Sequence, residues 1–277
     1  MSLLLPVRYP AKLYSHNDPD APQISNTDGA IKTIIKACLV TGYGAKAGAG
    51  WTALFEDGFR IVLRLPDVGR ALGSPELKIE NGGGKYRVVS QNDPAGLDDA
   101  AEVANVPLLS RDNRCGTEWH VVATDVGFLM WYQMAESDYG TAKDKGFFLV
   151  YSAVSALLPS DSVTFVCSFS NMVSATTGIG NPWMARERYK DMLNNADLGI
   201  INYTRADINQ TDVDVFQNFA LSKWVSPVEH SLNKNINQAV APINVGGRAY
   251  LRLLLQNNYN PDAPHKNIYV TTDYWEV

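Results

Sequence analysis

Residues Asn26–Leu65 read NTDGAIKTIIKACLVTGYGAKAGAGWTALFEDGFRIVLRL, and this pattern decides the fold. Thr27 and Asp28 carry side-chain oxygens of the kind that cap the N-terminus of a helix. Apolar residues then recur at helical spacing over about three turns, namely Ile31, Ile34, Ile35, Cys38 and Leu39. We expect Gly42 and Gly44 to end this helix, because glycine adopts left-handed backbone angles without a steric clash.

The predicted helix is followed by a loop of small residues and by two strand patterns. Ala45–Gly50 contains a single charged side chain, Lys46. Trp51–Phe55 and Phe59–Leu65 have the composition of strands, and the intervening Glu56-Asp57-Gly58 is typical of a hairpin turn. We therefore predict a helix, a glycine loop and a hairpin that together nucleate an α+β core.

The stretch Ala37–Trp51, ACLVTGYGAKAGAGW, resembles a signature that opens a family of tailed-bacteriophage virion proteins. The pattern in that family is approximately A-C-L-V-x-G-Y-G-x-K-x-A-A-G-W. This chain departs from it at Gly48, where alanine is usual. The residues that carry the resemblance are Cys38, Gly42, Tyr43, Gly44, Lys46, Gly50 and Trp51.

Two further stretches resemble segments of the same family. Trp119-His120-Val121-Val122-Ala123 is similar to a strand with the pattern W-x-V-V-A-D, although the acidic residue is displaced by one position, to Asp125. Ser152–Ser168 is similar to a segment with a Pro-Gly-Asp turn between strands, which reads Pro159-Ser160-Asp161 here. The resemblance extends over Tyr14–Ser170, and its first motif is the most specific.

The resemblance implies a non-enzymatic structural component of a phage particle, with the tail, baseplate or neck as the expected place. Such a protein would assemble as a homo-oligomer and contact other virion proteins. A head (capsid) decoration protein is the alternative within this class, and a host-surface glycan-binding module is an alternative from another class. The family offers no catalytic, cofactor-binding or metal-binding residue to carry over. The expected location is the virion, after synthesis in the cytoplasm of the bacterial host.

Composition is that of an ordinary globular chain. The 277 residues are 45% hydrophobic with a net charge of -5, and the pI is near 5.4, so we expect no specific nucleic-acid surface. No run approaches the ~20 consecutive apolar residues that a membrane helix requires, and we predict no secretory signal. The cysteines form no C-x-x-C pair, which favours a reducing compartment; they are Cys38, Cys115 and Cys167.

Three sections are expected along the chain. Residues 1–23 contain four prolines and are predicted to be extended, either as an edge strand with a loop or as an arm that lies over a neighbouring subunit. Residues 24–170 are predicted to form the core, and residues 171–277 a C-terminal subdomain or an elaboration of that core. Asn181-Pro182 has the residues that begin a helix, which would run to Gly199 as the second helix.

The fold class that follows is α+β, a mainly antiparallel sheet with the Asp28–Leu39 helix packed on it and a loop-rich C-terminal half. A second hairpin is predicted around Asn81–Gly84, and the polar stretch Gln91–Gly116 has room for a short helix. Further strands are predicted at Trp119–Ala123, Gly127–Gln133, Phe147–Tyr151, Ser162–Phe169, Ile200–Tyr203, Ala249–Leu255 and Asn267–Tyr274.

The sequence contains no constellation of residues that predicts catalysis. The four histidines are far apart and in no metal-ligand spacing, and His120 is predicted to be a sheet-face residue. Glu118 and Asp125 lie near aromatic residues and are a candidate pair for glycoside cleavage, although nothing in their spacing requires that role. No nucleophile elbow and no phosphate-binding loop is present. We therefore expect a protein that is not an enzyme and holds no cofactor.

Overall fold

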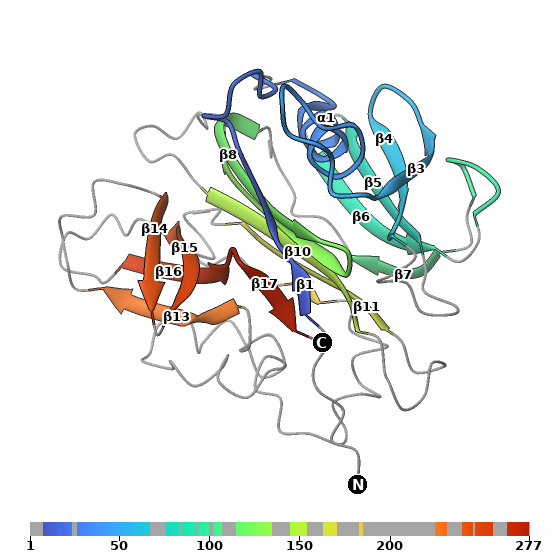
Figure 1. Cartoon of the computed structure of the whole chain (residues 1–277). Helices are drawn as coiled ribbons and strands as arrows, with labels where there is room; N and C mark the ends of the chain where they lie inside the picture. The colour runs from blue at the N-terminus through green and yellow to red at the C-terminus, as the bar shows by residue number, and fades with distance from the viewer. Residues whose placement is uncertain are drawn as a thin grey trace, which may run out of the picture.

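The computed structural model describes residues 8–23, 27–66, 76–82, 85–91, 94–99, 102–106, 115–134, 145–153, 163–170, 183–184, 225–231, 240–245, 247–256 and 265–276. Within these residues the chain is mainly β-sheet with one helical segment (Figure 1). Strand pairings throughout the described part are antiparallel. The predicted α+β class with a mainly antiparallel sheet is therefore confirmed.

The helix predicted from the apolar stripe is present. Helix α1 (Ala30–Lys36) continues without a break into a π-helical turn, η1 (Ala37–Thr41). All five residues of the stripe are completely buried, namely Ile31, Ile34, Ile35, Cys38 and Leu39. The helical segment ends at Gly42, whose φ of 75° lies in the left-handed region that glycine adopts without strain.

The N-terminus of the helix differs from the prediction. The capping position is held by Gly29, with φ 80°, which has no side chain, in place of the expected Thr27 or Asp28. The backbone N–H of Ile31 instead donates to Oδ1 of Asn81 at 3.0 Å. A side chain from a distant hairpin therefore satisfies one of the free N–H groups of the first turn.

The helical segment packs on a five-stranded sheet with the order β3-β4-β5-β6-β7. Its strands are β3 (Thr52–Glu56), β4 (Arg60–Arg64), β5 (Glu76–Gly82), β6 (Lys85–Gln91) and β7 (Glu102–Val106). Both predicted hairpins are confirmed as β3–β4 and β5–β6. The prediction of a short helix within Gln91–Gly116 is wrong at Glu102–Val106, because these residues form β7 and extend the sheet beside β6.

A six-stranded sheet has the order β12-β11-β10-β9-β8-β2. Its strands are β2 (Lys12–Ser15), β8 (Cys115–Thr124), β9 (Gly127–Met134), β10 (Lys145–Ala153), β11 (Val163–Ser170) and β12 (Trp183–Met184). The four strands predicted here are confirmed as β8 to β11. The helix expected at Asn181–Gly199 is wrong at Trp183 and Met184, which pair with β11; the rest of it lies outside the described residues.

The C-terminal part contributes a four-stranded sheet with the order β13-β16-β15-β14. Its strands are β13 (Val225–Ser231), β14 (Val240–Val245), β15 (Arg248–Gln256) and β16 (His265–Thr271). The strand predicted at Ala249–Leu255 is confirmed, and the one predicted at Asn267–Tyr274 is divided between β16 and β17 (Tyr274–Glu276). Ile200–Tyr203 lies outside the described residues. β17 pairs with β1 (Arg8–Pro10), which joins the two ends of the chain.

The main core lies where α1 meets one face of each of the two larger sheets. Figure 1 shows α1 between β8 and the strands of the five-stranded sheet, and α1 contacts β4, β5 and β8. Buried residues from all three elements form one apolar cluster, which includes Ile34, Leu39, Ile61, Leu63, Leu77, Ile79, Trp119, Val121, Phe128 and Met130. Apolar burial of this kind is the main stabilising term of the fold.

The proline-containing N-terminal segment packs against its own chain. β2 pairs with β8 as an edge strand, and Tyr14 is 1% exposed and belongs to the apolar core. Lys12–Ser15 therefore form an edge strand, which is one of the two arrangements expected for this segment. Across the described residues, no helix is long and apolar enough to cross a membrane.

Candidate functional site

The motif residues form a compact loop at the end of η1. Tyr43 and Lys46 exchange two backbone hydrogen bonds of 2.9 Å, which closes a tight turn around Gly44, with φ 52°. A Cβ atom on Gly48 would lie 2.4 Å from the carbonyl oxygen of Val40. Glycine at these positions therefore lets the loop turn sharply and lie directly on the helical segment.

The loop then returns along the π-helical turn. The N–H of Ala49 donates to the carbonyl of Cys38 at 3.0 Å, and the N–H groups of Gly50 and Trp51 both donate to Leu39, at 3.1 and 3.0 Å. These bonds occupy carbonyl groups that the end of the helical segment leaves without intrahelical partners. Gly50 has φ 98°, and a Cβ atom there would meet only an atom of Pro66, at 3.7 Å. Glycine is therefore favoured at this position by the backbone conformation and not by a lack of space.

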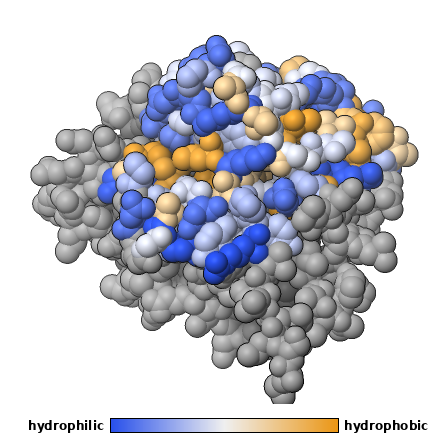
Figure 2. All heavy atoms as spheres, in the orientation of Figure 1, coloured by the Kyte–Doolittle hydropathy of each residue, from blue (hydrophilic) through white to orange (hydrophobic). Residues whose placement is uncertain are grey.

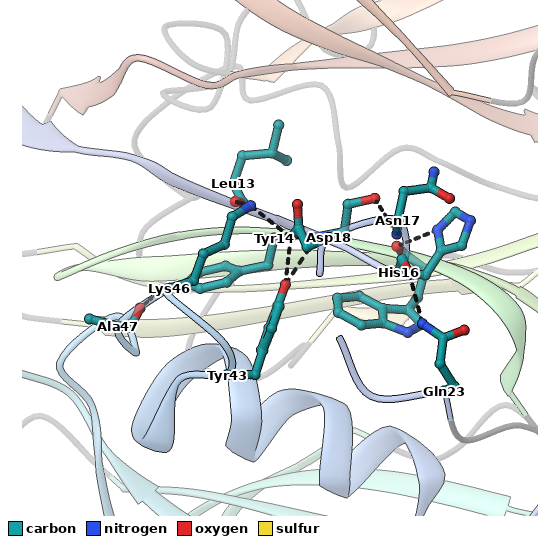
Figure 3. Close-up of polar contacts among 11 residues, drawn as sticks. Leu13, Tyr14, His16, Asn17, Asp18, Gln23, Tyr43, Lys46 and Ala47 are labelled. Carbon is teal, nitrogen blue, oxygen red and sulfur yellow. Dashed lines mark hydrogen bonds and ion pairs between the residues drawn. The ribbon is translucent and has the colours of Figure 1, made fainter. Parts of the chain in front are cut away.

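Asp18 lies at the centre of a polar cluster with two motif residues (Figure 3). Its Oδ2 accepts hydrogen bonds from Lys46 Nζ at 2.6 Å, from the Tyr43 hydroxyl at 2.7 Å and from the Ser15 N–H at 2.7 Å. Burial acts to raise the pKa of Asp18, but these three donors outweigh it and lower that pKa. Burial, followed by the bond to Asp18, raises the pKa of Tyr43. Asp18 is therefore an anion whose acceptor oxygen is fully used.

The same loop holds strand β2 through three consecutive residues. Lys12 Nζ donates to the carbonyl of Gly48, and the Tyr14 hydroxyl donates to the carbonyl of Ala47, both at 2.8 Å. Between them, Lys46 Nζ donates to the carbonyl of Leu13, also at 2.8 Å (Figure 3). The polar groups of the loop therefore fix the edge strand to the body of the protein.

Trp51 and Trp119 anchor this unit to the six-stranded sheet. The indole N–H of Trp51 donates to the carbonyl of Thr124 at 3.1 Å, and its ring meets Phe128 edge to face, with centroids 5.4 Å apart. Trp119 packs edge to face on Tyr43 at 6.2 Å. The first and second matched stretches therefore contact each other in the fold.

Cys38 is the remaining motif residue, and its side chain is completely buried. Burial is the main cause that raises its pKa well above the ordinary value. The thiol is thus kept neutral and away from solvent, as expected for a core cysteine and not for a nucleophile. The side chains of Cys115 and Cys167 lie outside the described part of the structure.

The two candidate carboxylates do not form a catalytic pair. Glu118 lies within β8 and Asp125 lies in the turn that follows this strand, and both are partly exposed. Seven residues of extended strand span roughly 23 Å, whereas the carboxyl groups of glycosidases lie within about 10 Å of each other. Among the residues that the structure describes, no group of three or more His, Cys, Asp or Glu side chains is placed to hold a metal ion.

His120 lies on β8 on the face away from α1, as predicted for a sheet-face residue, and it is 8% exposed. Its ring meets His16 edge to face at 5.3 Å and lies 5.7 Å from the ring of Trp131. Its Nδ1 atom has no hydrogen-bond partner within the described residues. Burial, and then the positive charge that His16 can carry, lower the pKa of His120 to about 4.

Sequence reasoning missed two members of this site, Asp18 and His16. Both lie in the turn that follows β2, in the run Ser15-His16-Asn17-Asp18. A local signal for Asp18 was available, because a short polar run between prolines is typical of a turn in which aspartate bonds to nearby backbone. Its partnership with Lys46, 28 residues away, has no local signal.

No match was found with family models, with curated proteins or with solved structures. The resemblance of Ala37–Trp51 to phage virion proteins therefore stays a prediction from the sequence. The geometry adds that the matched residues are spatially contiguous and that they serve one structural purpose.

Proposed function

We propose that this chain is a non-enzymatic structural component of a tailed bacteriophage particle, in the tail, baseplate or neck. It acts by oligomerisation and by contacts with neighbouring virion proteins. The observation that carries the proposal is that the polar side chains of the motif form hydrogen bonds with other residues of the same chain. Asp18 binds Tyr43 and Lys46, and Lys46 also holds β2. A loop used in this way maintains a shape, which is the task of a structural subunit.

The surface of the β3–β4 hairpin offers a place for contact with a neighbour. Phe59 lies at the turn of this hairpin and is 50% exposed. Among the described residues, it is the large apolar side chain that is classed as exposed. Leu54 and Phe55 on β3 are partly exposed. Figure 2 shows hydrophobic residues on the upper right of the molecule, where Figure 1 places β3 and β4. Apolar groups at a surface are typical of protein contact sites.

Localisation in the particle tests the proposal. Antibodies raised against the purified chain would be used for gold labelling of intact virions, isolated tails and isolated heads of the phage that encodes it. We expect label on the tail, baseplate or neck. Label confined to the heads would replace this assignment by a decoration protein, and purified particles without label and without peptides of this chain in mass spectrometry would refute a virion role.

A second measurement addresses catalysis. The purified chain is expected to release no sugar from the surface glycans of the host. Release that is abolished by Glu118→Gln or by Asp125→Asn would contradict the proposal. Release that both variants retain would come from other residues of the chain, which would also contradict the proposal, or from a contaminating enzyme, and a further purification step distinguishes the two.

A further inference from the structure

A pair of histidines lies at the point where the N-terminal segment leaves the six-stranded sheet. β2 is the last strand in the order of that sheet and pairs with β8 alone, in a register that ends with Ser15 opposite His120. Directly after β2, the N–H of His16 donates to the carbonyl of Trp119 at 3.1 Å. Its Nδ1 lies 3.3 Å from the same oxygen, a contact that is a hydrogen bond when Nδ1 carries the proton.

We propose that His16 and His120 form an acid-sensitive latch, which holds the turn after β2 (residues 16–23) on the body of the protein at neutral pH and favours its opening when His120 binds a proton. The inference concerns regulation within the chain and does not depend on a role in the virion. It rests on the edge-to-face contact of the two rings, on the buried Nδ1 of His120 and on the position of β2 at the edge of the sheet.

Among the described residues, a proton on His120 would have no adequate counter-charge. Asp18 is the described carboxylate whose charge favours protonation, but its Oδ2 is already bound by Lys46, Tyr43 and Ser15. The charge of His16 opposes protonation, since it acts to lower the pKa of His120. The neighbour of His120 on β9 is Trp131, which is uncharged. On β8 itself, Glu118 lies two residues before His120, beside a shift in the strand register.

The turn after β2 is the part of the structure that can move to hydrate His120. β8 is paired on both sides, with β9 and with β2, whereas β2 is paired on one side. Lifting the turn that carries His16 breaks its contacts with Trp119 and opens the buried ring of His120 to water. A charged imidazolium then gains hydration that the closed state denies it.

Hydrogen exchange followed by mass spectrometry tests the latch in the full chain at about pH 7 and about pH 4.5, with rates divided by the intrinsic rates at each pH. With a pKa of about 4 for His120 in the closed state and 6.5 for the exposed group, the opening equilibrium of residues 16–23 should rise roughly 50-fold in acid. Peptides from α1 should not share this rise. Equal acceleration in α1 would indicate general unfolding and would overturn the proposal.

Two variants make the test specific. His120→Gln removes the titrating group and should abolish the acid response of residues 16–23. His230→Gln makes the same chemical change on β13 and should keep it. An acid response that His120→Gln retains overturns the proposal. If that variant does not fold, imidazole signals of the unmodified chain decide the matter. His120 should stay neutral until residues 16–23 begin to exchange, and its protonation without any opening would refute the latch.

Discussion

Replacing Gly48 by alanine should destabilise this fold, although the change adds only one methyl group and alanine is usual at this position in the family that the motif resembles. The new Cβ would lie 2.4 Å from the carbonyl oxygen of Val40 and 3.2 Å from the N atom of Gly42, and ordinary contact begins at 3.4 Å. The obstructing atoms belong to the backbone, so no side-chain rotation relieves the clash. The loop must therefore move away from the helical segment until the distance from the Cβ to the Val40 oxygen rises from 2.4 Å to about 3.4 Å.

The size of the effect follows from what that movement breaks. The loop holds Lys12 Nζ at the carbonyl of Gly48 and the Tyr14 hydroxyl at the carbonyl of Ala47, both at 2.8 Å. A hydrogen bond of this kind contributes about 1 kcal/mol net, and overpacking costs about 1–3 kcal/mol. Some relaxation will reduce the sum. We expect Gly48→Ala to lower the free energy of unfolding by about 2–4 kcal/mol.

Urea denaturation followed by circular dichroism and tryptophan fluorescence measures this change. The matched control is Gly58→Ala, because a Cβ there meets no atom within 4 Å. This control should stay within about 0.5 kcal/mol of the parent, as surface substitutions usually do. Equal stability of the two variants would mean that the motif loop does not pack on the helical segment, and the reasoning about its glycines would be wrong.

Three further predictions concern stability and are measured in the same denaturation assay. Ile35→Ala removes a completely buried side chain and should cost about 2–5 kcal/mol, whereas a loss below about 0.5 kcal/mol would place the residue at the surface. Trp51→Phe leaves the buried carbonyl of Thr124 without its donor and should cost about 1–3 kcal/mol, which an unchanged midpoint would contradict. Asp18→Asn weakens the ion pair with Lys46. Because the pKa of Asp18 is lowered in the fold, its stabilisation is complete above its ordinary pKa and is lost as the pH falls through the lowered value. The parent should therefore lose its advantage over Asp18→Asn only in that acid range, and a constant difference at every pH would refute this assignment.

Local pattern determined the elements whose signals lie within a few residues. The apolar stripe of the helix, the end of the helical segment at Gly42 and the hairpin β3–β4 were predicted from the sequence and are present. The physical reason is that helical and strand periodicity, turn composition and the freedom of glycine at positive φ are properties of neighbouring residues.

Tertiary structure alone decided the features that depend on distant partners. The N-terminus of α1 is bonded by Asn81 from β5, 50 residues away, which makes the local caps unnecessary. Residues 102–106 form β7 because the edge of β6 accepts another strand, although their sequence left room for a helix. Lys46 finds Asp18 only because β2 lies beside the motif loop. Such contacts depend on the order in which strands pair, and no period within the sequence encodes that order.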